Sequence, residues 1–428
     1  MNVLIFSHPT LEGESVSEFS KQLIDHLLER GAKIASWLPK GARFDRALPA
    51  RIALLGPETE EVSGSWDVVL IEDSSVYTQA QRLLGQLSGI PHIFISHSQE
   101  QDGAVVPYPS LFRVIDSSRS PGHEHTGVTP ELIEIIPSPV NAAFQPPQEK
   151  NPSTHRILYL HNPLDRSLSV LTSLVATINR MPGCKLLIVA TGLEFIVKQI
   201  SNGNTKCIDG IEDRLTNILE ADLVVASGNA AAEVLMVGRP LIVAGVRGLG
   251  GLVIPDTYSK HAESGFQGRI GGVNGEIIPV DILEHEVKNA IAMGHKNVVE
   301  LVAQNRALAE KAFEASSLVR RAEQVLEDAV MLNRKLNSPQ ELAALKPRRA
   351  TNVIIKDLRD GEGYLLIRRP IGTLICRLSR KACEVFNDID GTLTLMQLYR
   401  KHVDDGETEF TTFAESIKTL WHSKVVVF

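Results

Sequence analysis

The sequence predicts an α/β protein with two Rossmann-like domains and a smaller α+β domain after them. Short, almost wholly apolar runs alternate with amphipathic helical segments, and this alternation occurs on both sides of a proline-rich stretch. Such runs are typical of parallel strands buried on both faces. The pattern changes after residue 346, where polar turns separate shorter elements. The chain of 428 residues is long enough for about two to four domains.

Composition narrows the possible classes of protein. Apolar residues make up 43% and charged residues 22%, as in ordinary soluble proteins. No segment approaches the ~18 consecutive apolar residues of a membrane span, and the N-terminus lacks the features of a signal peptide. The net charge of −7 argues against a general nucleic-acid binder. Cys184, Cys207, Cys376 and Cys383 show no metal-ligand spacing, so we expect reduced thiols, a cytoplasmic location and no metal.

The first Rossmann-like domain is predicted to span residues 1–145. A helix is expected after the first strand, because Phe19, Leu23 and Leu27 share one helical face. We interpret Glu131–Ser153, rich in proline and polar residues, as an interdomain linker. The predicted strands of this domain include Val3–Ser7, Asp67–Asp73 and His92–Ser98.

The second Rossmann-like domain is predicted to span residues 151–333. Its strands are RILYLHNP, KLLIVATG, ADLVVASG and PLIVAG, and helices follow from about residue 283. The third strand ends at Ser227 and Gly228, and a helix is expected to begin at Asn229, so these residues would form an anion site at a helix N-terminus. Glu233 lies about one turn further and suits a ribose diol. The alternative is an ordinary solvated helix residue.

The stretch SGNAAAEVLMVGRPLIVAG resembles the donor-nucleotide motif of GT-B glycosyltransferases, in which a glutamate precedes a Gly-x-Pro turn. MNVLIFSHPT, IEIIPSPVNAAFQPP and RILYLHNPLDRSLS are similar to the family's first strand, its interdomain segment and the start of its nucleotide domain. The resemblance covers about residues 1–333. It implies two Rossmann-like domains in the GT-B arrangement, with a nucleotide-sugar donor, UDP-linked by our interpretation, in the cleft.

The resemblance also implies roles for single residues. Glu233 would bind the nucleotide ribose, and Gly13 would lie near the donor diphosphate. Arg166 would neutralise the diphosphate, because Asn162 stands where the family often has an arginine. Ile208 belongs to CIDGIEDRL, which resembles the loop that binds the base.

Two histidines are candidate catalytic residues. His97 ends a predicted strand, and the family often has a histidine here that touches the donor sugar or its phosphate; the alternative is a histidine bonded to a neighbouring loop. His8 follows the first strand and could act as general base if the reaction inverts the sugar. The helix N-terminus at Ser227, with Arg166, would stabilise the leaving nucleoside diphosphate without a metal.

One departure from the family concerns the donor sugar. Retaining enzymes with this layout carry two glutamates separated by seven residues, but counting back from Glu233 reaches Val225. The first glutamate is therefore missing. Gly250, in GLGGLVIPD, could supply a backbone N–H near the sugar or phosphate instead, and an ordinary glycine-rich loop is an equal alternative.

Residues 346–428 resemble a PqqD-like domain, the recognition element of enzymes that modify ribosomally made peptides. The centre FNDIDGTLT and the closing helix before an apolar tail carry this resemblance. It implies a small winged helix that adds the peptide leader as a strand, in a groove between the third strand and third helix. The residues expected at this groove are Cys376, Leu378, Phe413, Ile417 and Leu420.

The charge of this block favours a peptide over DNA. Ten Lys or Arg residues and three Asp or Glu residues lie between Lys346 and Lys381, whereas Phe410–Lys424 is not an obviously basic recognition helix. Alternatives are a solvated basic hairpin and a membrane-surface patch.

The sequence therefore predicts a glycosyltransferase acting on a precursor peptide, with nucleotide sugar and peptide leader as partners and neither nucleic acid nor stable membrane insertion. A glycosyltransferase for an envelope polysaccharide or lipid-linked acceptor is one alternative. A catalytically inactive scaffold that binds nucleotide or peptide is another.

Overall fold

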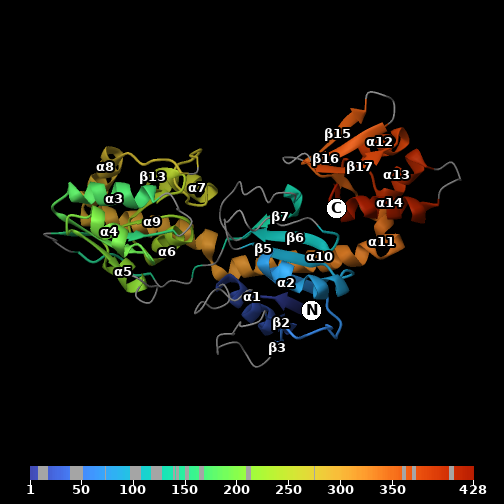
Figure 1. Ribbon diagram of the computed structural model, residues 1–428, viewed down its shortest axis with the longest axis horizontal. Helices are drawn as coiled ribbons and strands as arrows, with labels where there is room; N and C mark the ends of the chain where they lie inside the picture. Colours follow the sequence, from blue (N-terminus) through green and yellow to red (C-terminus); the bar gives the residue numbers. More distant parts are fainter. Residues whose placement is uncertain are drawn as a thin grey trace. The chain divides into compact units, whose positions relative to one another are not determined.

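The computed structural model describes residues 1–7, 18–38, 52–72, 74–96, 108–116, 128–137, 140, 144–149, 154–162, 168–208, 214–273, 275–358, 363–368, 373–403 and 409–428 (Figure 1). Contacts divide the chain into two compact units. One comprises residues 1–117, 123–136 and 319–428, and the other comprises 118–122 and 137–318. The predicted α/β class with parallel sheets is confirmed.

The first unit begins with a seven-stranded parallel sheet in the order β3-β2-β1-β4-β5-β6-β7. Helix α1 (Glu18–Glu29) buries the predicted face of Phe19, Leu23 and Leu27, each at most 1% exposed. The sheet and its second helix comprise β1 (Asn2–Phe6), β2 (Lys33–Trp37), β3 (Ile52–Leu55), β4 (Val68–Glu72), α2 (Ser74–Gln86), β5 (His92–Ser96), β6 (Leu111–Asp116) and β7 (Ile133–Ile135).

Strand β7 falls inside the segment that we interpreted as a linker. Ile133–Ile135 pairs with β6 as the outermost strand of the sheet, preceded by a 3-10 turn at Pro130–Leu132. An edge strand of three residues, only partly buried, carries too few apolar positions for recognition from the sequence. The linker therefore begins later than we predicted.

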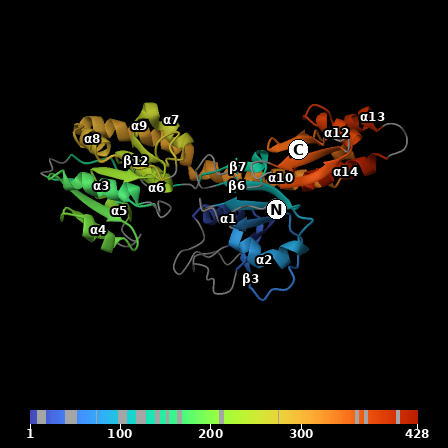
Figure 2. The ribbon, with the colours of Figure 1, turned by 45° about the horizontal axis from the view of Figure 1, so that its top comes forward.

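The second unit contains a six-stranded sheet in the order β10-β9-β8-β11-β12-β13; of the strands described, β13 is antiparallel to its neighbour and the others pair in parallel. Neighbouring residues of β8 point to opposite faces: Ile157 and Tyr159 join one hydrophobic cluster, and Leu158 and Leu160 join the other. Figures 1 and 2 show helices covering both faces. The strands are β8 (His155–Leu160), β9 (Cys184–Val189), β10 (Thr205–Ile208), β11 (Leu223–Ala226), β12 (Leu241–Gly245) and β13 (Gly248–Leu252).

Within the described residues, helices α3 to α9 complete the second unit. Helices α3 and α8 supply the apolar cluster on one face of the sheet, whereas α6 and α9 contribute to the cluster on the other. These elements are α3 (Ser169–Asn179), α4 (Glu194–Ile200), α5 (Arg214–Glu220), α6 (Gly228–Val237), α7 (Pro255–Glu263), α8 (Val280–Ile291) and α9 (His295–Phe313).

Helix α10 (Ala315–Leu336) belongs largely to the first unit, although the sequence placed it with the second domain. Glu323 lies 2.9 Å from His26 and 3.3 Å from Arg30, both of α1. The amphipathic pattern of α10 predicts a helix but does not reveal which sheet its apolar face covers.

The C-terminal block contains a three-stranded antiparallel sheet, order β15-β16-β17, and a group of helices. The block comprises α11 (Pro339–Ala344), β14 (Arg348–Arg349), β15 (Val353–Leu358), β16 (Gly363–Arg368), β17 (Thr373–Leu378), α12 (Arg380–Asn387), α13 (Leu395–His402), α14 (Phe410–His422) and β18 (Val426–Val427).

This block is hydrogen-bonded to the first sheet domain. The buried guanidinium of Arg368 donates to Thr129 Oγ1 at 3.1 Å, and this hydroxyl donates to the carbonyl of Lys424 at 2.9 Å. Lys424 Nζ in turn donates to the carbonyl of Pro109 at 3.0 Å. We call these four residues the docking cluster. The block therefore packs on the N-terminal domain through buried polar groups.

Thr394 is the N-cap of α13. Its hydroxyl accepts from the backbone N–H of Gln397 at 3.2 Å, and the Gln397 side chain accepts from the N–H of Thr394 at 2.8 Å. We expect Thr394→Ala to lower the free energy of unfolding by about 1 kcal/mol, because the N–H of Gln397 loses its acceptor. Denaturant unfolding of the whole chain measures it. Thr412→Ala, at an exposed site of α14, is the control, and equal losses in both variants would contradict the cap.

Candidate functional site

The second sheet reverses its strand order between β8 and β11, and polar residues follow both strands. Strands β9 and β10 lie on one side of β8, whereas β11 and β12 lie on the other. Ligands of open α/β sheets bind outside the carboxyl ends of the strands at such a switch point. Asn162, after β8, donates from Nδ2 to Oγ of Ser227, after β11, at 3.3 Å. The switch point therefore holds a connected pair of polar side chains.

The N-terminus of α6 lies at this switch point, as the sequence predicted. Ser227 is its N-cap in an extended conformation, and only 3% of its surface is exposed. Gly228 has φ +58°, and its N–H donates to the carbonyl of Phe266 at 3.0 Å. Asn229 is exposed. One N–H that we expected to be open to a ligand is thus used, although the helix dipole still favours negative charge at this end.

The turn that uses this N–H is strained, and we call Ser264–Gly268 the clamp turn. Gly265, Phe266 and Gly268 have φ values of +64°, +57° and +127°. A left-handed phenylalanine is uncommon, and such strain persists only where the surroundings enforce it. The Phe266 ring is buried and lies 5.9 Å from the ring of Tyr258.

The clamp turn is also bonded to the turn after β12. The carbonyl of Gln267 accepts from the N–H of Arg247 at 3.0 Å. A Cβ on Gly245 would lie 2.7 Å from this carbonyl and 2.7 Å from Ser227 Cβ. Only glycine fits there. The ends of β11 and β12 therefore pack closely against the clamp turn.

Glu233 has an ion partner that the sequence did not reveal. Its Oε2 lies 2.7 Å from Arg214 Nη2, and the two side chains are 27% and 29% exposed. Burial raises the pKa of Glu233, and Arg214 opposes that shift. Arg214 begins α5 and belongs to CIDGIEDRL, the stretch that resembles a base-binding loop. The carboxylate is therefore held by a cation from that neighbouring segment.

Arg247 is a cation that we missed in the sequence. It lies in the turn between β12 and β13 and is half-buried. Its guanidinium has no ion pair or side-chain hydrogen bond within the described residues. Arg269, by contrast, makes two bonds to Glu276, at 2.9 and 3.0 Å. The close backbone contact between this turn and the clamp turn, which depends on tertiary packing, brings Arg247 to the site.

Four predicted site residues, His8, Gly13, His97 and Arg166, lie outside the described residues. Ile208 ends β10 and is half-buried. Gly250 belongs to strand β13, where we expected a loop. A Cβ there would lie 2.7 Å from the carbonyl of Gly268, so close packing against the clamp turn explains this glycine.

Comparison with known proteins gives similarity to solved structures. A glycosyltransferase from Rickettsia africae has a TM-score of 0.55 at 11% identity, covering 77% of this chain and 98% of that one. Sucrose-phosphate synthase from Thermosynechococcus elongatus scores 0.53 at 14% identity, with 77% and 98% covered. Anabaena HepE, solved with UDP and glucose, scores 0.52 at 13% identity, with 76% and 99% covered. The fold is that of known glycosyltransferases.

No family model and no curated protein matches the sequence. At identities this low, the glycosyltransferase fold does not assign an activity. Within the described residues, no group of three or more potential ligands could hold a metal ion. None of the helices described is both long and apolar enough to cross a bilayer.

The candidate peptide site lies outside the switch point, in the C-terminal block. Cys376 and Leu378 belong to β17, which pairs only with β16 among the described strands and so has one open edge. Phe413 and Ile417 are buried at 7% and 3% exposure, and Leu420 is half-buried. Phe413 and Ile417 therefore contribute to the hydrophobic core of the block rather than to an exposed groove wall.

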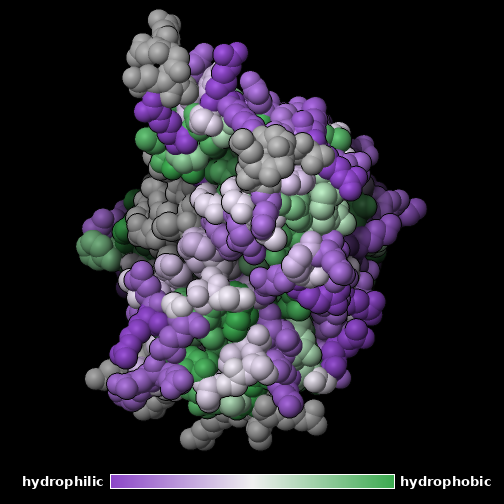
Figure 3. Space-filling view, turned by 90° about the vertical axis from the view of Figure 1, so that its right-hand side faces the viewer, coloured by the Kyte–Doolittle hydropathy of each residue, from purple (hydrophilic) through white to green (hydrophobic). Residues whose placement is uncertain are grey.

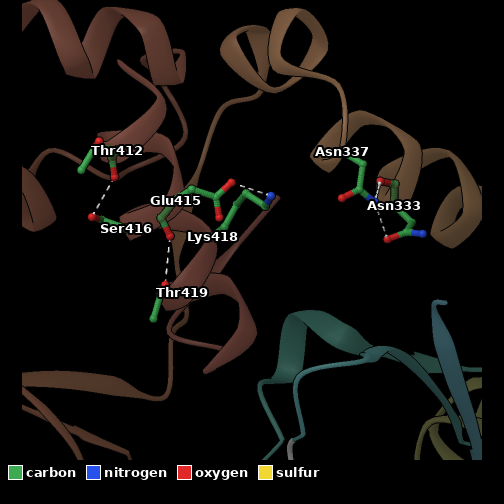
Figure 4. Close-up of polar contacts among 7 residues, drawn as sticks. All are labelled: Asn333, Asn337, Thr412, Glu415, Ser416, Lys418 and Thr419. Carbon is green, nitrogen blue, oxygen red and sulfur yellow. Dashed lines mark hydrogen bonds and ion pairs between the residues drawn. The ribbon is translucent and has the colours of Figure 1, made fainter. Parts of the chain in front are cut away.

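The outer face of α14 satisfies its polar groups within the helix (Figure 4). Ser416 and Thr419 donate to carbonyls one turn earlier, and Lys418 donates to Glu415 at 2.8 Å. A recognition helix for DNA presents free cations to phosphates. Helix α14 lacks that character.

The surface shown in Figure 3 is largely hydrophilic, with smaller hydrophobic areas between the hydrophilic ones.

Proposed function

We propose that this protein is a glycosyltransferase that transfers a sugar from a nucleotide donor, and that its acceptor is a ribosomally made peptide. The observation that carries the first part is the switch point of the second sheet. There, the N-terminus of α6 lies beside the Asn162–Ser227 pair in a fold that glycosyltransferases share, and Glu233, further along α6, is paired with Arg214. The helix N-terminus suits an anionic diphosphate, and the carboxylate suits the hydroxyls of a ribose.

Each part of the site suits one part of the donor. The N-terminus of α6 favours the diphosphate, and Arg247 supplies the positive charge that Asn162 does not. Glu233 accepts hydrogen bonds from the two ribose hydroxyls. Both cationic features also favour the negative charge that develops on the leaving nucleoside diphosphate.

A binding and turnover experiment on the full-length protein tests the donor. Calorimetric titrations with UDP and GDP would identify the base, and release of nucleotide from UDP-glucose, UDP-galactose and GDP-mannose would identify the sugar. We expect binding of UDP and slow hydrolysis of one UDP-sugar. Binding without turnover, even when acceptor is added, would favour an inactive scaffold. Absence of binding to any nucleotide would overturn the proposal.

The open edge of β17 supports a peptide acceptor. A sheet edge presents unpaired N–H and carbonyl groups to which an extended peptide can add as a strand. Between residues 346 and 381 the chain carries ten basic and three acidic side chains, so an acidic leader is favoured. A leader held there raises the local concentration of the segment to be modified.

The test uses the full chain, because the docking cluster shares its buried bonds with the N-terminal domain. The short peptide encoded nearest to the gene is labelled and titrated by fluorescence anisotropy. Leu374, in β17, is 59% exposed, and Ile375→Pro beside it removes a backbone donor from that strand. Tight binding lost in Ile375→Pro supports the peptide acceptor. Nucleotide turnover without peptide binding favours a polysaccharide or lipid-linked acceptor.

A further inference from the structure

Gln267, at the centre of the clamp turn, has a buried amide oxygen without a partner. The residue is 2% exposed, and Oε1 accepts no hydrogen bond within the described part of the chain. Leaving a buried acceptor unsatisfied costs about 1–3 kcal/mol, so native proteins keep few such atoms. The strained backbone that carries Gln267 adds to this cost. Both features indicate a side chain placed for a ligand.

The amide of Gln267 lies directly over the N-terminus of α6. Its Nε2 is 2.9 Å from the point where a Cβ on Gly228 would be, and Asn162 Nδ2 is 3.8 Å from the same point. The missing side chain of Gly228 thus leaves room for two amides from distant segments. They meet outside the carboxyl ends of β8 and β11, where ligands of such sheets bind.

We propose that Gln267 binds the sugar of the donor, with its amide oxygen accepting a hydrogen bond from a sugar hydroxyl. This inference rests on the proposed function. Phosphate oxygens are acceptors at the pH of the cell, so a diphosphate leaves the amide oxygen unsatisfied, whereas a hydroxyl can donate to it. Two adjacent hydroxyls satisfy the amide in either orientation, because each hydroxyl both donates and accepts.

The position of Gln267 also accounts for the missing first glutamate, where the chain has Val225 instead. The strand before α6 carries no carboxylate for a sugar, and Gln267 reaches the same end of the helix from the clamp turn. The sugar contact has thus moved to a segment about forty residues later in the chain.

The test compares UDP with UDP-sugars on the full-length protein. Calorimetry would measure the affinities of UDP, UDP-glucose and UDP-galactose for wild type, Gln267→Met, Gln267→Ala and the exposed-site control Gln304→Leu. We expect both Gln267 variants to bind the preferred UDP-sugar about tenfold more weakly, with the affinity for UDP changed less than about twofold. We expect Gln267→Met to melt no lower than wild type, because methionine fills similar space without an orphaned acceptor.

The outcomes separate the two proposals. Equal weakening for UDP and UDP-sugar, or no weakening in either variant, would overturn the role of Gln267 while leaving the proposed function intact. Wild-type protein that binds no nucleotide and no nucleotide sugar would overturn both. Gln304→Leu should match wild type throughout, since Gln304 lies on the exposed side of α9 and its amide donates to Glu300.

Discussion

Replacing Arg214 with alanine is expected to weaken UDP binding about tenfold near neutral pH and to make it strongly pH-dependent. Burial raises the pKa of Glu233, and the Arg214 guanidinium at 2.7 Å limits that rise. Without the cation, the pKa of Glu233 moves further upward. The ionised carboxylate accepts both ribose hydroxyls, whereas the protonated form retains less accepting capacity. Affinity therefore falls as the pH decreases through the raised pKa.

Calorimetry with UDP from about pH 5 to about pH 8 measures this effect, since the ordinary glutamate pKa of about 4.3 lies below that range. Wild type should lose affinity only toward the acid end, and Arg214→Ala should lose it at higher pH. Arg214→Lys should restore part of the difference. Glu233→Gln should bind weakly with no pH dependence from this carboxyl group.

Arg156→Ala is the matched control, because Arg156 pairs with Glu220 at the same 2.7 Å but on the exposed surface. A pH profile for Arg214→Ala that parallels wild type would show that Arg214 does not tune Glu233. Arg214 is thus a positioning residue in the proposed site, and its effect is read in the pH profile rather than in the affinity alone.

Replacing Lys424 with methionine is expected to raise the free energy of unfolding by a few kcal/mol at about pH 7 and below. Burial lowers the pKa of Lys424 to about 7, with Arg113 and Arg368 adding to the shift. The Trp421 ring, whose centroid is 4.1 Å from Nζ, opposes it by attracting the ammonium. The carbonyl of Pro109 would still have a hydrogen-bond partner in the variant, because His422 Nδ1 lies 3.3 Å from it.

The direction follows from proton binding. Between about pH 7 and the ordinary lysine value of 10.5, the unfolded chain binds a proton that the folded chain lacks, so wild-type stability gains from rising pH. Below about pH 7 both states are protonated, and the cost of burying the ammonium is fully present. The advantage of Lys424→Met should therefore shrink as the pH rises from about 7 to about 10.

His92 and His422 also face this lysine, and both have lowered pKa values, that of His92 to about 4, chiefly through burial. They titrate below the window of the lysine effect. Denaturant unfolding of wild type and Lys424→Met between about pH 7 and about pH 10 measures the difference in their free energies of unfolding. Lys418→Met, which removes an ammonium paired with Glu415, is the control. A stability difference that does not change with pH would contradict a buried, neutralised lysine.

Much of the fold could be predicted because buried strands appear in the sequence as short apolar runs. The runs at Asp67–Asp73 and His92–Ser98 became β4 and β5, and the helical face of Phe19 became the buried side of α1. Strand β7 was missed because an edge strand of three residues has almost no periodic signal. The assignment of α10 failed for a different reason: an amphipathic helix does not specify which apolar surface it covers.

Some residues of the candidate site could likewise be predicted from the sequence, and others could not. Ser227, Gly228, Asn229 and Glu233 could be placed from one stretch of sequence, because a strand followed by a small-residue helix puts them at one helix end. Their partners could not. Arg214 reaches Glu233 from another helix, and the clamp turn reaches Gly228 from nearly forty residues away.

Local sequence was enough to predict most strands and helices, the helix N-terminus at Ser227 and the basic character of the C-terminal block, since these depend on neighbouring residues. Only the packing of distant segments shows that Glu233 is ion-paired, that the turn holding Arg247 bonds to the clamp turn, and that Gln267, whose amide nitrogen lies over Gly228, has an amide oxygen without a partner in the described part of the chain. The difference arises from the distance along the chain over which each interaction acts. Propensity and periodicity act over a few residues, whereas desolvation, ion pairing and hydrogen-bond satisfaction depend on which distant segments the fold brings together.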